Sequence, residues 1–343
     1  MQLQDVRWRF DLRPAPELAV AHLLTRQAAP EKLWRLSSLF GRSSAYLSTI
    51  YNDLNTYLAR RFGGIVEFHP RLRDYELLRI WGETVGERSG YGRDRIWGFI
   101  DGTFRPMARP IVNESRHYTG HKKRHGIRFQ GVATPDGLIS SLMGPYPANR
   151  NDWWIYSDSG LGDRMREVSL PPSSSFSTDL RQIYGERETL YLYGDPAYHH
   201  SYGILAPYPI RQRTLEQHRL NVAMSRCRIH VENCFGKISN LWQSHQMPSR
   251  LQSLNSPVAA YYIVAVLLTN IFTCIRGNET IFGLKPPSLH DYLHPQGESF
   301  PPSFLRSSLP PIALLMTLTR RSSISSRSRR KPTRSSSPEL FTS

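Results

Sequence analysis

Residues 95–106 read RIWGFIDGTFRP, in which an apolar run leads directly into a carboxylate, Asp101. The run from Ile96 to Ile100 is typical of a buried strand, whereas Asp-Gly is a common turn signal. Asp101 therefore either forms a turn at the end of a strand or is a charge that the strand holds in place for chemistry. On local grounds the turn is favoured, so the choice depends on the other carboxylates of the chain.

The chain is long enough for a catalytic domain and a small accessory domain, and it is strongly basic. It has 343 residues and a formal net charge of +16. Residues 320–334 carry seven basic residues and no acidic one, and subtracting these seven leaves +9 on the rest. Such a charge is typical of a protein that binds nucleic acid. Three scattered cysteines favour a reducing compartment over a disulfide framework or a zinc finger.

One segment has nearly the length and composition of a membrane span. Residues 258–275 are apolar apart from Asn270 and two threonines, and the N-terminus lacks the apolar core of a signal peptide. We expect a buried core helix here and no association with a membrane.

Residues 1–90 have a helical pattern. Pro30 is expected to begin a helix that stops at Gly41, and Ser43 or Ser44 is expected to cap a second helix. Apolar residues at helical spacing mark the buried face of this second helix: Leu47, Ile50, Tyr51, Leu54, Tyr57 and Leu58. The pair fits a helix-turn-helix unit, although any two packed helices give the same pattern.

Residues 91–285 combine strand-like runs with a long helix, so we expect an α/β domain with a mixed sheet. Strands are predicted at 96–100 and 189–194, and a hairpin within 126–144 turns at Pro135-Asp136-Gly137. A polar, Ser/Pro-rich insertion covers 150–188, and a helix is predicted from about 215 to 242. Residues 286–343 are rich in Pro, Ser and Arg, which predicts a mostly disordered tail.

A second carboxylate, Asp195, follows an apolar run in the same way as Asp101. If the two strands are neighbours, both carboxylates lie at one edge of the sheet. A third carboxylate, Glu232, lies on a helix with a wide apolar stripe, on a face that it shares with Arg228. A firmly anchored carboxylate is what a metal site requires.

Three converging carboxylates repel one another, and a divalent cation is the usual compensation. Ligands that are all oxygens suit Mg²⁺ or Mn²⁺, and two such ions about 3.5–4 Å apart can promote phosphoryl transfer. In a basic protein this pattern indicates an enzyme that holds nucleic acid by its phosphates and cuts it. No GxSxG or P-loop motif is present, so a serine hydrolase or an ATPase has little support.

Four motifs occur in an order that resembles the DDE-type transposases of the PIF/Harbinger superfamily, especially the fungal branch. They are FIDGTFRPMARP (99–110), YTGHKKRHGIRFQGVATPDGLISSLMGPYPANRNDWWIYSDSGL (118–161), LYGDPAYHHSYG (192–203) and NVAMSRCRIHVENCFGKISNLW (221–242). Residues 33–58 are similar to the N-terminal helix-turn-helix region of that family, and the resemblance covers roughly residues 10–290.

The resemblance implies an RNase H-like core in which Asp101, Asp195 and Glu232 form the catalytic, metal-binding triad. The interval of 37 positions between Asp195 and Glu232 fits the short second interval of the family. Asp152 stands where many members carry a His-Asp pair, but Asn151 precedes it here, so Asp152 is a secondary candidate ligand. The family also implies a Myb-like accessory protein, and the cutting of paired ends favours a homodimer.

The segment HYTGHKKRH places His117, His121 and His125 four residues apart. On a helix these could bind zinc, but Gly120 and Gly126 favour a loop. A loop that contacts DNA phosphates is therefore the preferred interpretation, and a GHKR-like loop also follows the first Asp in the resembling family. The candidate DNA-contacting residues are Lys122, Lys123, Arg124 and, beside Glu232, Arg228.

Two functions stay open. The first is a metal-dependent DNA endonuclease that cuts transposon ends, leaves a 3′-hydroxyl and joins it to target DNA. The second is a domesticated or inactive transposase that binds DNA or protein. Either would act in the nucleus, and the basic tail fits a nuclear localisation signal, a DNA-binding arm or a solvated end equally well.

Overall fold

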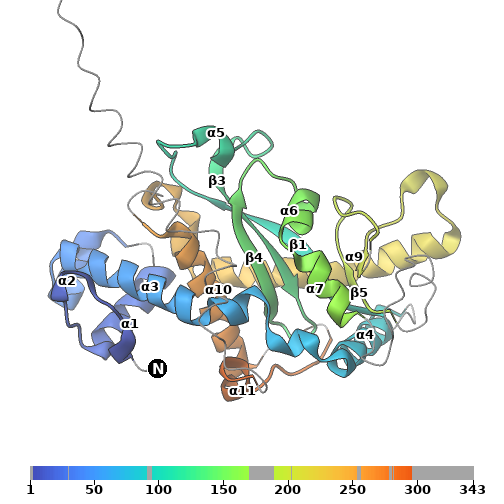
Figure 1. Ribbon diagram of the computed structural model, residues 1–343, viewed down its shortest axis with the longest axis horizontal. Helices are drawn as coiled ribbons and strands as arrows, with labels where there is room; N and C mark the ends of the chain where they lie inside the picture. The colour runs from blue at the N-terminus through green and yellow to red at the C-terminus, as the bar shows by residue number, and fades with distance from the viewer. Residues whose placement is uncertain are drawn as a thin grey trace, which may run out of the picture.

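The computed structural model describes residues 3–29, 31–90, 95–169, 189–201, 203–252, 256–277, 280 and 282–295. Its N-terminal part is helical, as predicted. The helices are α1 (Pro16–Ala28), α2 (Leu33–Phe40), α3 (Ser44–Glu67) and α4 (Tyr75–Ser89), with short 3-10 turns η1 (Leu3–Asp5), η2 (Arg9–Asp11) and η3 (Pro70–Arg73). They begin at one end of the molecule and reach the sheet through α3 and α4 (Figure 1).

The α2–α3 junction has the end signals expected from the sequence. Gly41 follows α2 in the left-handed conformation, with φ of 61°, which glycine adopts without strain. The Ser43 hydroxyl accepts a hydrogen bond from the Tyr46 amide and caps α3. Leu36 and Leu47 lie in a small buried cluster between the two helices. The first residue of α2 is Leu33, and Pro30 lies outside the described residues.

The sheet is mixed. Its strands are β1 (Ile96–Pro106), β2 (Tyr118–Thr119), β3 (Arg124–Ala133), β4 (Ile139–Pro147), β5 (Tyr191–Tyr193) and β6 (Ile204–Leu205). β3 pairs antiparallel with β2, β4 and β1, whereas β1–β5 and β5–β6 are parallel. The predicted hairpin is confirmed, because β3 and β4 join through a turn in which Gly137 has φ of 86°. The α/β class with a mixed sheet is therefore correct.

The prediction that the first strand ends at Ile100 is wrong. β1 continues to Pro106, and Asp101 pairs with Gly131 of β3 in the antiparallel ladder. The apolar run ends where full burial ends, while the backbone hydrogen bonds continue beyond it. Asp101 is therefore a strand residue and does not form a turn.

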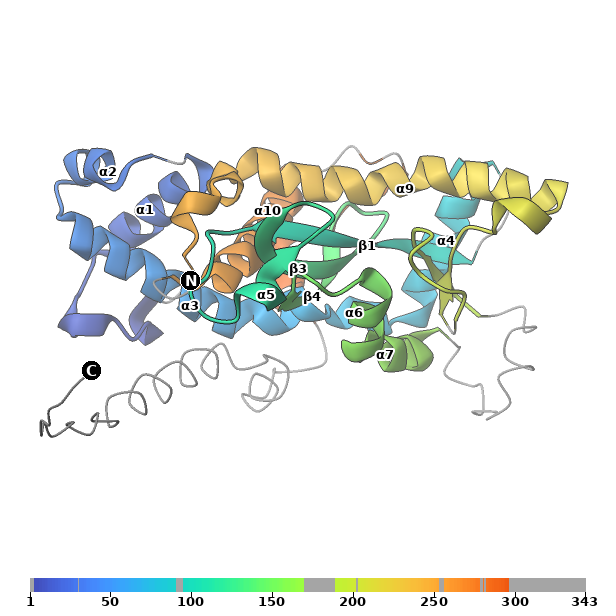
Figure 2. The same ribbon diagram turned by 90° about the horizontal axis from the view of Figure 1, so that it is seen from above.

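Two long helices complete the core. Helix α9 (Leu215–Leu241) runs along one side of the sheet, and the short helices α6 (Asp152–Asp158) and α7 (Leu161–Val168) lie on the other side (Figure 2). These two short helices occupy part of the predicted insertion, whose residues 170–188 lie outside the described ones. Helix α10 (Val258–Arg276) packs against α3 and β4.

Helix α10 is the core helix that the sequence predicted. Within the described residues it is the one helix that could cross a membrane by length and composition, but 67% of its apolar window is buried inside the protein. Asn270 accounts for the polar position in this apolar helix. Its side chain accepts a hydrogen bond from the Ile139 amide at 3.1 Å and donates one to the Ile139 carbonyl at 2.9 Å. A buried amide needs such partners, and here they attach α10 to β4.

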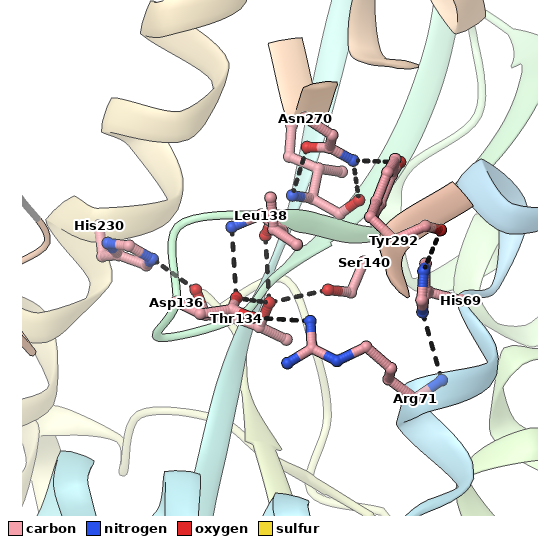
Figure 3. A network of polar contacts seen from close by, with 10 residues as sticks. His69, Arg71, Thr134, Asp136, Leu138, Ser140, His230, Asn270 and Tyr292 are labelled. Atoms are coloured by element: carbon pink, nitrogen blue, oxygen red, sulfur yellow. Dashed lines mark hydrogen bonds and ion pairs between the residues drawn. The ribbon is translucent and has the colours of Figure 1, made fainter. Parts of the chain in front are cut away.

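A buried polar network holds the turn of the hairpin (Figure 3). Arg71 of η3 forms an ion pair at 2.9 Å with Asp136, whose side chain is 1% exposed. Asp136 also accepts a hydrogen bond from the Thr134 hydroxyl, and His230 of α9 contacts the Thr134 carbonyl at 2.8 Å. Breaking such a buried pair costs several kcal/mol, so the turn is fixed to both η3 and α9.

The network also reaches the C-terminal part of the described chain. Helix α11 (Leu289–Leu293) carries the fully buried Tyr292, whose hydroxyl accepts from Asn270 and whose carbonyl contacts His69. The packed body therefore extends past residue 286, where the tail was predicted to begin. Residues 296–343, including the basic segment 320–334, lie outside the described residues.

Candidate functional site

Asp101 and Asp195 lie at the same edge of the sheet because their strands are parallel neighbours. Phe99 of β1 is opposite Tyr193 of β5, and each aspartate follows its member of this pair by two residues. The Asp195 carboxylate accepts a hydrogen bond from the Ala197 amide at 2.9 Å, which fixes the turn after β5. The sequence predicted two strands that lead to an aspartate, and the structure shows that they are neighbours.

Burial and the neighbouring charges shift the pKa of Asp101. This pKa is raised to about 6, first because the side chain is buried and further because Asp195 and Asp152 place negative charge nearby. Arg228 acts in the opposite direction, as does the Gly102 amide, which donates to the carboxylate at 2.8 Å. Raised pKa values of this kind gather at functional sites.

Asp152 is the third member of the cluster. It is the first residue of α6, and the Asn151 side chain caps this helix by accepting a hydrogen bond from the Trp154 amide. The Asp152 side chain lies directly against Gly102, where an added Cβ atom would overlap its carboxylate. Arg128 donates to both carboxylate oxygens, at 3.0 and 3.1 Å. Burial raises the pKa of Asp152, Arg128 lowers it, and the charge of Asp195 raises it again.

Glu232 is connected to Asp101 through an arginine. Arg228 contacts Asp101 at 3.4 Å and Glu232 at 3.0 Å, and the Glu232 side chain is 54% exposed. The predicted helix and face are confirmed, since α9 is held by buried residues such as Met224 and Val231. Within the part of the chain that the structure describes, no three His, Cys, Asp or Glu side chains are already arranged around a metal position.

Two buried residues beneath the cluster were not found from the sequence. Gln130 donates to the Tyr198 hydroxyl at 2.9 Å and to the Asp152 carbonyl at 3.1 Å. Burial, together with the charges of Asp152, Asp101 and Asp195, raises the pKa of Tyr198 well above its usual value, so its hydroxyl stays neutral. A polar residue at an inward position of the apolar β3 strand was the signal that could have revealed Gln130.

The basic segment forms a loop, as the glycines predicted. Lys122, Lys123 and Arg124 are exposed in the connection between β2 and the start of β3. The charge of Lys122 lowers the pKa of Asp152, which places this lysine beside the carboxylate cluster. Arg228, the fourth predicted phosphate contact, is instead engaged with two carboxylates.

The three histidines of the segment 117–125 do not form a joint site. His117 contacts the Gly126 carbonyl at 3.2 Å, whereas His125 contacts Glu114 at 2.9 Å. His121 is exposed in the turn between them. Among the described residues, this arrangement offers no set of three ligands for zinc.

The carboxylates fit a divalent cation. Their ligand atoms are all oxygens, which Mg²⁺ and Mn²⁺ prefer, and they come from three separate segments that carry Asp101, Asp152 and Asp195. Burial and the charges of Asp195 and Asp152 raise the pKa of Asp101 more than Arg228 and the Gly102 amide lower it. A cation at this edge would lower the repulsion among the carboxylates.

A comparison with protein families agrees with this chemistry. Residues 100–270 match the family described as DDE superfamily endonuclease, and the matched segment contains all four acidic residues of the cluster. This segment is therefore similar to the endonucleases of the DDE superfamily, a class that generally uses divalent metals. Searches of curated proteins and of solved structures find no match to the chain.

Proposed function

We propose that the protein is a metal-dependent DNA endonuclease of the DDE transposase type, of the PIF/Harbinger superfamily and its fungal branch. One observation carries the proposal: Asp101 of β1 and Asp195, which follows the parallel neighbour β5, each lie two residues after a paired strand residue, within the segment that matches the DDE endonucleases. The mixed sheet that holds them supports the RNase H-like core that the resemblance implies.

In this proposal Asp101 and Asp195 hold the metal, Glu232 completes the ligand set, and Asp152 is a supporting ligand. When bound, two Mg²⁺ or Mn²⁺ ions would polarise the phosphodiester and activate water. Lys122 and its neighbours in the exposed loop would hold the phosphates of the strand beside the carboxylates. Hydrolysis would leave a 3′-hydroxyl on the transposon end, and this hydroxyl is the group that would attack target DNA.

The remaining parts of the proposal concern DNA recognition and assembly. The capped α2–α3 pair is the candidate helix-turn-helix, and the exposed Trp34 and Arg35 on α2 are available to DNA. A Myb-like partner, a homodimer and a nuclear location complete the proposal, and they rest on the resemblance and on the basic charge.

A second function, a domesticated transposase that binds DNA or protein without cutting, is favoured by one observation. Arg228 forms ion pairs with both Asp101 and Glu232, and it stands between these two proposed ligands. A metal site would require this arginine to move. If it does not move, the cluster is a stable ion-pair network without chemistry.

Nicking of supercoiled plasmid separates the two functions. The plasmid carries candidate terminal repeats, and the reactions contain Mg²⁺, Mn²⁺ or EDTA. Asp101→Ala, Asp195→Ala and Glu232→Ala are each expected to abolish nicking while DNA binding persists. Asp163→Ala, which removes an exposed acid of α7, is the matched control and should cut like the wild type. If wild-type protein binds DNA but cuts it neither alone nor with a Myb-like partner added, the second function is correct.

A further inference from the structure

Aromatic side chains border the carboxylate cluster. Trp153 and Trp154 directly follow Asp152 on α6, and His199 follows Asp195 by four residues. The rings of Trp153 and His199 meet edge to face, with centroids 4.8 Å apart. The two segments that supply these aspartates therefore also bring their aromatic rings together at the same place.

Trp154 is not explained by the core. Its neighbours Ile155 and Tyr156 are buried, whereas Trp154 is only half-buried and lies outside the hydrophobic clusters of the described residues. The guanidinium of the exposed Arg150 lies 4.3 Å above its ring, and the Tyr146 ring meets it at 6.1 Å. Aromatic rings and stacked arginines of this kind accept nucleobases.

The surrounding charges suit a nucleic-acid strand better than a protein partner. Arg150, Lys122 and Arg128 place positive charge on this side of the cluster. Lysine is depleted from protein interfaces, whereas it commonly contacts the phosphates of nucleic acids. In duplex DNA the bases already stack on one another, so an aromatic surface gains a base only when that base is unpaired.

We propose that Trp154 and Arg150 form an aromatic shelf that stacks an unpaired nucleobase of the DNA strand, next to the phosphate that is cut. The inference rests on the proposed function, because it assumes that the adjacent carboxylates act on DNA. It adds a requirement for local unpairing of the substrate at the site. Since every base has a flat face, the shelf selects unpaired structure and is tolerant of sequence.

The test measures binding without cleavage. Two DNA duplexes, identical except that one carries a single unpaired 2-aminopurine, are titrated with the full-length protein in EDTA. Wild type is expected to prefer the duplex with the unpaired base and to quench its fluorescence. Trp154→Ala and Arg150→Ala are expected to reduce this preference about 10-fold while binding of the perfect duplex stays within about 2-fold.

Trp34→Ala is the matched control. Trp34 is also a non-core tryptophan beside an arginine, with Arg35 5.4 Å from its ring, but it lies on α2, at one end of the molecule, whereas α6 lies beside the sheet (Figures 1 and 2). Its replacement should leave the ratio of the two affinities at the wild-type value, even if both affinities change. Arg150 is exposed, so its replacement should not disturb the fold.

The shelf is refuted if wild type does not distinguish the two duplexes, or if Trp154→Ala and Arg150→Ala keep the wild-type ratio. Because the assay contains no metal, its outcome is independent of the nicking test. If the protein prefers unpaired bases but never cuts DNA, the shelf is supported and the proposed nuclease activity is refuted. If the protein cuts DNA without this preference, only the shelf is refuted.

Discussion

Burial disfavours the negative charge of Asp101. In the absence of metal, the substitution Asp101→Asn is therefore expected to stabilise the protein. The pKa of this carboxyl is raised from 3.8 to about 6 in the folded state. Each pKa unit corresponds to about 1.36 kcal/mol, so ionised Asp101 costs the fold about 3 kcal/mol at pH 8. Asparagine resembles the neutral acid and lacks this cost.

The sign of the pH dependence follows from the raised pKa. The folded state favours the neutral form of Asp101. The resulting contribution to the free energy of unfolding is fully present below pH 3.8 and is lost as the pH rises through 6. Asp101→Asn should therefore exceed the wild-type free energy of unfolding by about 3 kcal/mol at pH 8 and by about 1 kcal/mol at pH 4.5.

Urea unfolding in EDTA at these two pH values measures the difference. Asp163→Asn, at a side chain that is 77% exposed, is the control and should change the free energy of unfolding by less than about 0.5 kcal/mol. The reasoning is refuted if Asp101→Asn is no more stable than wild type at pH 8, or if the difference does not depend on pH.

Three further substitutions test other parts of the site and its support. Gly102→Ala should displace Asp152 and lower the rate of plasmid nicking at least about 10-fold, since an added Cβ overlaps that carboxylate; unchanged nicking would show that the position of Asp152 is unimportant. Arg228→Gln removes the cation that competes for two carboxylates, so calorimetric titration should show tighter Mn²⁺ binding than in wild type; weaker binding would mean that the arginine organises the ligands. Asp136→Ala leaves Arg71 without its buried partner and should lower the free energy of unfolding by roughly 3 kcal/mol; a loss below about 0.5 kcal/mol in urea would contradict the role of the network at the hairpin turn.

The sequence was sufficient for features that depend on local pattern. The apolar runs before Asp101 and Asp195 predicted two strands, and the helical stripe around Glu232 predicted an anchored helix. The Pro-Asp-Gly turn of the hairpin and the caps of α2 and α3 were also readable, because turn and cap geometry depends on a few adjacent residues. These features placed three carboxylates on the correct elements.

Features that depend on contacts between distant segments were not readable. The arginine at position 228 was expected to contact phosphates, and its position between Asp101 and Glu232 depends on how α9 lies across the sheet. The place of Asp152 depends on Gly102, which lies 50 positions earlier in the chain and leaves room for the carboxylate. The end of β1 was misjudged because burial and hydrogen bonding stop at different residues.

The central claim is that the carboxylate edge of the sheet binds the metal of a nuclease, and crystals soaked in Mn²⁺ test it most directly. Anomalous scattering locates manganese without reference to any assumed site. We predict a manganese peak in contact with Asp101 and Asp195, with Arg228 moved away from Asp101. Manganese bound elsewhere, with Arg228 still paired to Asp101 and Glu232, would contradict the account.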